Sequence, residues 1–254
     1  MTESAATELI ALPLAKQEAG RELRVMVLGA FQFADGGSLL VMPGGSQRLM
    51  AFLALRGRTV SRAATAGTLW PDVSEAHAQA ALRSALSRLD DIPRRALQVN
   101  AVDLALEQSV QVDIREARAL ANRLLVVGGA PAAADTTAAA VLALSSDILP
   151  DSYDDWAMLE AEDWRQLRLH ALDALARQLS DDRRYGDAIG AALAALRGEP
   201  LRETANATLI HVHLAEGNPS EALAAFDRYR TLLHTELGLD PSPLLSQLLR
   251  DIRA

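Results

Sequence analysis

The sequence predicts a mainly α-helical protein with a small β part, in which a mixed N-terminal domain precedes an all-α array. Three observations indicate this fold class. Alanine and leucine, two strong helix formers, dominate the composition. Apolar residues alternate near the N-terminus, which is typical of short strands. A pattern of small and apolar residues recurs after 34 positions in the C-terminal part, which is typical of stacked helix pairs.

The N-terminal part predicts a tail followed by a small sheet. Residues 1–21 are polar and alanine-rich without a stable period, and we expect them to form a disordered tail. Apolar residues alternate from Leu23 to Val27, and a Gly-Gly pair follows Asp35. This combination predicts short antiparallel strands joined by a turn, at the start of a domain that spans residues 22–107.

Three helices and a hairpin are expected in the rest of this domain. Ser46 can cap the first helix, Ser61 begins the second, and the third covers residues 77–89 and is ended by Pro93. Residues 97–106 then read as two strands around a turn. Three helices followed by a hairpin is the order of a winged helix-turn-helix domain. In such domains the third helix reads DNA in the major groove.

The third of these helices has two distinct faces. Asp72 or Ser74 can cap it, with Glu75 placed to complete a capping box. Its apolar stripe predicts the buried face, formed by Ala78, Ala81, Leu82, Ala85, Leu86 and Leu89. Small residues let a helix enter the major groove, and arginines at its edges can reach phosphates or guanine. The opposite face has this character, and its candidate DNA-contacting residues are Arg83, Ser84, Ser87 and Arg88.

Taken alone, the same pattern also fits an ordinary amphipathic surface helix with two solvated arginines. The segments before and after it favour the DNA-reading interpretation, because they complete the winged helix. Other arginines of the domain are then candidates for contacts with DNA phosphates, namely Arg48, Arg62, Arg94 and Arg95.

Four segments of this domain carry a resemblance to a known family. They are Ser-Gln-Arg-Leu at 46–49, Val-Ser-Arg at 60–62, Leu-Trp-Pro-Asp at 69–72 and Leu-Arg-Ser-Ala-Leu-Ser-Arg-Leu at 82–89. They resemble the OmpR-like winged helix of SARP-type bacterial transcriptional activators. In that family Val-Asp and an all-helical bacterial transcriptional activation domain (BTAD) follow, and Val112 and Asp113 stand at that point here. The resemblance covers residues 23–250, nearly the whole chain.

Residues 108–254 predict an array similar to tetratricopeptide repeats. Ala188 and Ala222 lie 34 positions apart, where paired helices of such repeats cross closely. A single helix pair cannot bury its apolar faces, so the repeat favours a stacked array. The array is expected to end in a last helix that runs to Arg253.

The segment 149–156 resembles the signature of the activation domain. Its aromatic residues, Tyr153 and Trp156, are expected to pack between helices, because buried aromatic side chains mostly serve cores. Asp154 and Asp155 look like paired carboxylates. Adjacent acids point in different directions and flank a helix end here, so capping is the expected role.

Several classes of protein are excluded by what the sequence lacks. Without cysteine there are no disulfides or thiolate metal sites. No phosphate-binding glycine loop and no hydrolase or metalloprotease motif is present, so we expect no enzyme and no cofactor. His211 and His213 do not share a helix face, so no metal site is expected. Without a signal peptide or a long apolar run, we expect a cytoplasmic protein with no membrane contact.

The net charge of −8 is unevenly distributed. Residues 1–107 contain equal numbers of acidic and basic residues, so the whole excess of acidic residues lies in residues 108–254. A neutral N-terminal domain permits DNA contact through a few arginines, although it lacks a strongly basic surface. The acidic array is expected to avoid DNA and to bind protein.

We therefore expect a DNA-binding transcriptional regulator, more specifically an activator, that binds double-stranded promoter repeats. Its array would contact RNA polymerase, another regulator protein or a second copy of the chain in a homodimer. The alternative is a helical-repeat adaptor whose winged helix no longer reads DNA. Asp90 and Asp91 support it, because family members commonly carry basic residues there. So do Ala63, Ala64 and Gly67, where larger residues are usual in the second helix.

Overall fold

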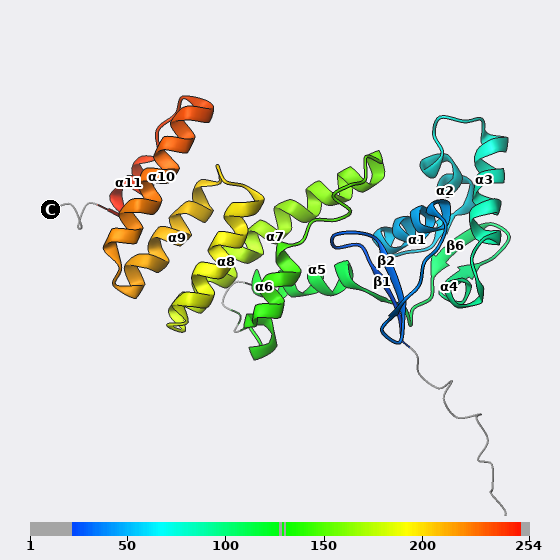
Figure 1. The fold of residues 1–254 in the computed structure, drawn as a ribbon, viewed down its shortest axis with the longest axis horizontal. Coiled ribbons are helices and arrows are strands. Elements are labelled where there is room, and N and C mark those ends of the chain that lie inside the picture. Colours follow the sequence, from blue (N-terminus) through cyan, green and yellow to red (C-terminus); the bar gives the residue numbers. More distant parts are fainter. Residues whose placement is uncertain (1–21, 127–128, 130, 250–254) are drawn as a thin grey trace, which may run out of the picture.

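The computed structural model describes residues 22–126, 129 and 131–249, so the expected tail at 1–21 lies outside the described residues. The molecule is elongated, with two small sheets near one end and a stack of paired helices at the other (Figure 1). The predicted fold class, mainly α with a winged helix followed by a helical array, is confirmed. No helix in the described ranges is both long and apolar enough to cross a lipid bilayer.

A four-stranded sheet begins the described chain, with the order β3-β2-β1-β7. Its strands are β1 (Leu23–Met26), β2 (Gln32–Asp35), β3 (Ser38–Leu39) and β7 (Gln111–Val112). The predicted antiparallel strands are confirmed, and Gly36 and Gly37 turn the chain with φ of 55° and 87°, which glycine adopts without steric cost. β7 pairs in parallel with β1 and was not expected, because two residues are too few to show a period. It extends the sheet past the expected domain boundary between residues 107 and 108.

The winged helix follows in the predicted order. Its helices are α1 (Gly44–Arg56), α2 (Arg62–Leu69), α3 (Glu75–Ser87) and a short α4 (Asp91–Arg95). A second sheet has the order β4-β6-β5 and consists of β4 (Val60–Ser61), β5 (Leu97–Val99) and β6 (Asp103–Leu106). Ser61 caps α2 as predicted, because its hydroxyl accepts the backbone N–H of Ala64 at 3.1 Å.

Three local predictions in this domain are wrong. Ser46 does not cap α1, because the helix begins two residues earlier and buries Ser46 in its first turn. The third helix ends at Ser87 and does not continue to Leu89, although Leu89 is buried as expected. Pro93 lies inside the first turn of α4, where the missing N–H of proline is tolerated.

The C-terminal part is a stack of helices that pack on their neighbours in sequence, from α7 to α10. Its elements are α5 (Asp113–Leu124), the 3₁₀ helix η1 (Ala133–Thr136), α6 (Ala138–Ser145), α7 (Asp155–Asp181), α8 (Tyr185–Gly198), α9 (Glu203–Glu216), α10 (Pro219–Leu237) and α11 (Pro243–Gln247). Ala188 and Ala222 are fully buried, as the repeat predicts. Gly198 is also constrained, since a Cβ there would lie 3.0 Å from Leu169. The last helix ends at Gln247, and residues 250–254 lie outside the described residues.

A carboxylate joins the two parts of the chain at the end of β1. Asp113, the first residue of α5, accepts the backbone N–H groups of Val27 at 3.0 Å and of Leu28 at 2.9 Å. A hydrogen bond to a charged group contributes about 1.5–3 kcal/mol, roughly twice a neutral one. The start of the helical array is therefore fixed to the N-terminal sheet.

A second connection comes from the loop between α6 and α7. Gly29 donates to the carbonyl of Asp147 at 2.7 Å, and Leu149 donates to the carbonyl of Val27 at 3.0 Å. Arg168 of α7 is only 2% exposed and forms an ion pair with the carboxylate of Asp147. The loop is thus held between the end of β1 and the core of the array.

The far end of the array contains a polar group with an altered pKa. Tyr229 on α10 is buried and donates to a carboxylate oxygen of Glu203 at 3.3 Å. Burial, followed by the charge of Glu203, raises the pKa of Tyr229 from 10.0 to about 12. In the unfolded chain the phenol ionises near pH 10.0, whereas the folded chain keeps it protonated to about pH 12. Stability from this group is complete below pH 10 and is lost as the pH rises toward 12.

Tyr229→Phe should flatten the decline of the unfolding free energy between pH 10 and pH 12, because it removes the ionisable phenol. Urea denaturation at a series of pH values measures this slope. Tyr153→Phe is the matched control, because Tyr153 is 88% exposed and should leave the slope as in the parent chain. An identical slope in both variants would contradict the prediction.

Candidate nucleic-acid interface

α3 lies at the end of the molecule farthest from α10 and α11 (Figure 1). Its buried face consists of Ala78, Leu82, Ala85 and Leu86, which is most of the predicted stripe. The hydroxyl of Ser46 donates to the carbonyl of Ala85 at 2.7 Å, and both groups are buried. Ser46 therefore connects α1 to α3 and fixes the position of the candidate recognition helix.

The predicted capping box at the start of α3 is wrong. Ser74 occupies the N-cap position, but its side chain accepts no backbone N–H and instead bonds Nδ1 of His77 at 2.7 Å. Glu75 is the first helical residue, so it cannot return a bond from the third position, as the box requires.

The exposed face of α3 carries the four candidate residues. Arg83, Ser87 and Arg88 are exposed and Ser84 is half-buried. Arg88 follows the last helical residue, yet its N–H still donates to the carbonyl of Ser84 at 3.1 Å, so it continues the helical geometry. Among the described residues, neither arginine has a hydrogen-bond or ion-pair partner on its side chain. The face thus presents two unpaired guanidinium groups around small hydroxyl side chains.

The β5–β6 hairpin forms the wing, and its turn contacts the start of α2. The Asn100 side chain accepts the N–H groups of Val102 at 2.8 Å and Asp103 at 2.7 Å, which closes the turn. The backbone N–H of Arg62 donates to the carbonyl of Val102 at 2.8 Å. The guanidinium of Arg62 reaches the carbonyl of Asn100 at 3.5 Å, so this candidate phosphate contact lies beside the wing.

The other three candidate phosphate contacts differ in their surroundings. Arg95 is exposed, and its side chain has no hydrogen-bond or ion-pair partner in the described part of the chain. Arg94 donates to the carbonyl of Leu86 at 2.9 Å and so satisfies a group at the end of α3. Arg48 binds Asp154 through two hydrogen bonds, with Nε at 2.9 Å, and the structure does not bring it to the surface of α3.

Two acids lie next to this surface. Asp90 precedes α4 and Asp91 begins it, and both are exposed. Asp90 makes no side-chain capping bond. Their charges oppose that of Arg88 and lower the positive potential at the C-terminal end of α3.

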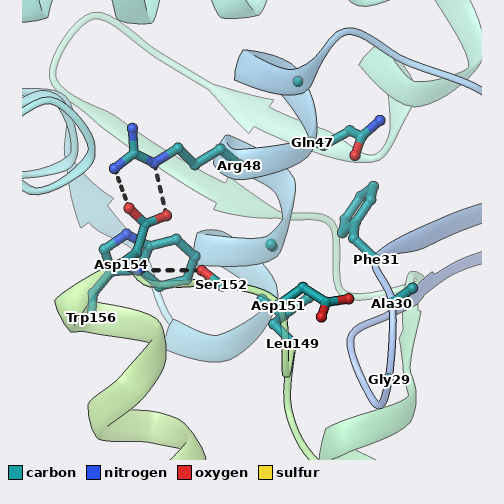
Figure 2. Close-up of a pocket in the computed structure, with 12 residues that line it drawn as sticks. Gly29, Ala30, Phe31, Gln47, Arg48, Leu149, Asp151, Ser152, Asp154 and Trp156 are labelled. Carbon is teal, nitrogen blue, oxygen red and sulfur yellow. Dashed lines mark hydrogen bonds and ion pairs between the residues drawn. The ribbon is translucent and has the colours of Figure 1, made fainter.

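α1 packs against the first turns of α7 along a seam that the sequence did not reveal. Arg48 binds Asp154, Phe52 meets Trp156 edge to face with ring centroids 5.4 Å apart, and Arg56 lies 3.6 Å from Glu160. Figure 2 shows the first of these pairs with both hydrogen bonds. The seam holds the winged helix on the helical array. The α1 residues of the seam, Arg48, Phe52 and Arg56, lie four positions apart in the sequence. This spacing places them on one helix face and indicates that another element packs there.

Two predictions about the segment before α7 need correction. Trp156 packs between helices as expected, but Tyr153 is 88% exposed and packs in no core. Asp154 occupies the N-cap position, yet its carboxylate makes no capping bond and binds Arg48 instead. An arginine 106 positions away competes successfully for this carboxylate, which no local pattern could show.

Within the described part of the chain, no group of three or more His, Asp or Glu side chains could hold a metal ion. The exposed candidate residues carry fixed charges and hydroxyls. They can bind an anionic surface.

Comparisons with known proteins give one consistent assignment. Residues 112–253 match the family "Bacterial transcriptional activator domain". The chain is 29% identical to the regulatory protein AfsR of Streptomyces griseus in an alignment 247 residues long that covers 89% of this chain. It is also 29% identical to AfsR of Streptomyces coelicolor in an alignment 252 residues long that covers 92% of this chain. The match covers only 24% of either relative, so the chain spans about a quarter of their length.

A solved structure is similar over almost the whole chain. It is Mycobacterium tuberculosis EmbR in complex with a low affinity phosphopeptide, with a TM-score of 0.68 and 23% sequence identity. The likeness covers 92% of this chain and 65% of that one. It supports the fold described above.

The seam pair should have a measurable coupling energy. A double-mutant cycle with Arg48→Ala and Asp154→Ala should give a coupling near the upper end of the ~0.2–1 kcal/mol known for ion pairs, because this pair is bidentate and half-buried. Urea denaturation of the four proteins measures it. The matched cycle at the more exposed Arg24–Glu116 pair should give less. Equal or absent coupling at Arg48 and Asp154 would show that the pair does not hold the seam.

Proposed function

Because the chain belongs to the bacterial transcriptional activator domain family, and is a SARP-type activator, we propose that it binds promoter DNA through α3. The helical array then contacts RNA polymerase or another regulator protein. The chain acts by binding and not by catalysis. Its relatives are about four times longer than this chain, so these activities are proposed for this chain and are not carried over from the whole relatives.

The exposed face of α3 is the observation that carries the proposal. Arg83 and Arg88 lack intramolecular partners among the described residues, and the side chains beside them on this face, Ser84 and Ser87, are small. Guanidinium groups form paired hydrogen bonds with a guanine edge, and small neighbours allow the helix to approach the base pairs. α3 also lies at one end of an elongated molecule, so a duplex can reach it without meeting the acidic array.

Contacts to the DNA backbone come from either side of α3 in this proposal. Arg62, beside the wing, and Arg95, at the end of α4, are the best placed of the four phosphate candidates. Arg94 and Arg48 would first have to leave the Leu86 carbonyl and Asp154. We therefore expect them to contribute less to DNA affinity.

The array supplies the activating contact. The net negative charge of the chain lies entirely in residues 108–254, and stacked helix pairs present an extended face to a protein partner. A second copy of the chain on a neighbouring promoter repeat is a further candidate partner.

The adaptor without DNA affinity remains the second candidate, because a specific observation favours it. Asp90 and Asp91 are exposed within a few residues of Arg88, and a phosphate beside them would be repelled.

Arg83→Ala should reduce affinity for the promoter by about 1–3 kcal/mol and alter base preference, because a base contact is lost. Arg95→Ala should weaken promoter and random duplex alike, because a phosphate contact is lost. Fluorescence anisotropy with both duplexes measures these effects. Arg228→Ala on α10, at the other end of the molecule, is the matched control and should bind normally. Unchanged binding in both test variants would mean that α3 does not read DNA.

A salt titration separates the regulator from the adaptor. A DNA binder releases counterions, so its affinity for random duplex should fall steeply as salt rises, with a slope of about −0.9 per neutralised phosphate. Arg95→Ala should make the slope less negative by about one. An adaptor would show no duplex binding even at low salt, and Asp90→Asn with Asp91→Asn would then be the variant to restore it.

A further inference from the structure

A cavity lies in the seam between the winged helix and the helical array (Figure 2). Its volume is about 350 Å³, and residues of both parts line it, including Phe31, Gln47 and Arg48 from one side and Leu149, Asp151 and Asp154 from the other. Ligand sites commonly have volumes of about 300–1,000 Å³ and often lie between domains. The cavity is large enough for a small metabolite of about ten non-hydrogen atoms.

The cavity carries one unbalanced negative charge. Arg48 and Asp154 neutralise each other through their two hydrogen bonds. Asp151 is exposed to the cavity and has no ion-pair or hydrogen-bond partner in the described part of the chain. Figure 2 shows its carboxylate directed toward the loop that carries Ala30 and Phe31. A charged oxygen and an aromatic ring therefore face the same space.

Gln47, a second polar side chain of the lining, also favours a hydrogen-bond donor. The amide nitrogen of Gln47 donates one of its two N–H groups to the carbonyl of Met42 at 2.7 Å, and Figure 2 shows this nitrogen directed away from Phe31. The amide oxygen remains as an acceptor, and Figure 2 shows it directed toward Phe31. An anion would meet two acceptors here, and the one guanidinium nearby is already paired.

We propose that this cavity binds a small organic cation. Its ammonium or guanidinium group donates to the Asp151 carboxylate and the Gln47 amide oxygen. Its apolar part packs on Leu149, and its charged group also faces the ring of Phe31, which adds a cation–π attraction. This site is separate from α3, and the inference does not depend on DNA binding.

Because the cavity lies between the two parts of the molecule, a bound ligand would affect how firmly they are held together. Phe31 and Gln47 belong to the N-terminal part, whereas Leu149 and Asp151 belong to the loop that leads into α7. A ligand that contacts both sides stabilises the seam, since a ligand that binds only the assembled state favours that state.

Isothermal titration calorimetry of the full chain tests the proposal with three amines: tyramine, agmatine and putrescine. We expect saturable binding of at least one amine. The matched anion 4-hydroxyphenylacetate, which has the ring of tyramine and a carboxylate, should not bind. Asp151→Asn should weaken amine binding about tenfold, the usual effect of losing one charged hydrogen bond. Asp155→Asn removes an exposed acid outside the cavity lining and should bind the amine like the parent chain.

Three results would overturn the proposal. They are no saturable binding of any of the three amines, equal binding of 4-hydroxyphenylacetate, and unchanged binding by Asp151→Asn. Circular dichroism of Asp151→Asn should match the parent chain, because Asp151 is exposed and its side chain bonds no other group among the described residues. Phe31→Leu provides a second variant, which keeps an apolar side chain but removes the aromatic face and should weaken binding by a smaller factor.

Discussion

The hydrogen bonds from the end of β1 to the carboxylate of Asp113 hold the two halves of this molecule together. Beyond the last residue of β1, the backbone N–H groups of Val27 and Leu28 need acceptors, since unpaired N–H groups away from water are costly. Asp113 supplies them from the first turn of α5. It is in position because the preceding strand, β7, pairs with β1. The loop before α7 completes the junction by accepting the N–H of Gly29.

The seam and the array are stabilised by different interactions. The array is packed through small side chains, and even one added carbon at Gly198 would meet Leu169. The seam instead consists of half-exposed ion pairs, such as Arg48 with Asp154, and of the aromatic contact between Phe52 and Trp156. Close packing tolerates little change, whereas charged side chains at a surface can exchange partners at low cost. A substitution in the seam should therefore cost less unfolding free energy than one in the closely packed array.

Patterns within one element predicted much of the fold, and contacts between distant elements account for what they did not predict. Ser61 caps its helix because the acceptor and the N–H lie three residues apart. Ser46 has the same side chain, but a carbonyl 39 residues away engages it, and no periodicity contains that information. The candidate DNA face followed from helical spacing. The engagement of Arg48 did not, because its partner is 106 residues distant.

The seam also bears on how the molecule would be oriented around a duplex. α1 contacts α3 through Ser46 and contacts α7 on the side that carries Phe52, so a single helix connects the DNA-facing helix to the array. On the proposed function, the array then projects from DNA in a set direction. B-form DNA turns once in about 10–10.5 base pairs. Moving the binding site by half a turn would carry the array to the opposite side of the duplex, so this architecture makes activation sensitive to helical phase as well as to distance.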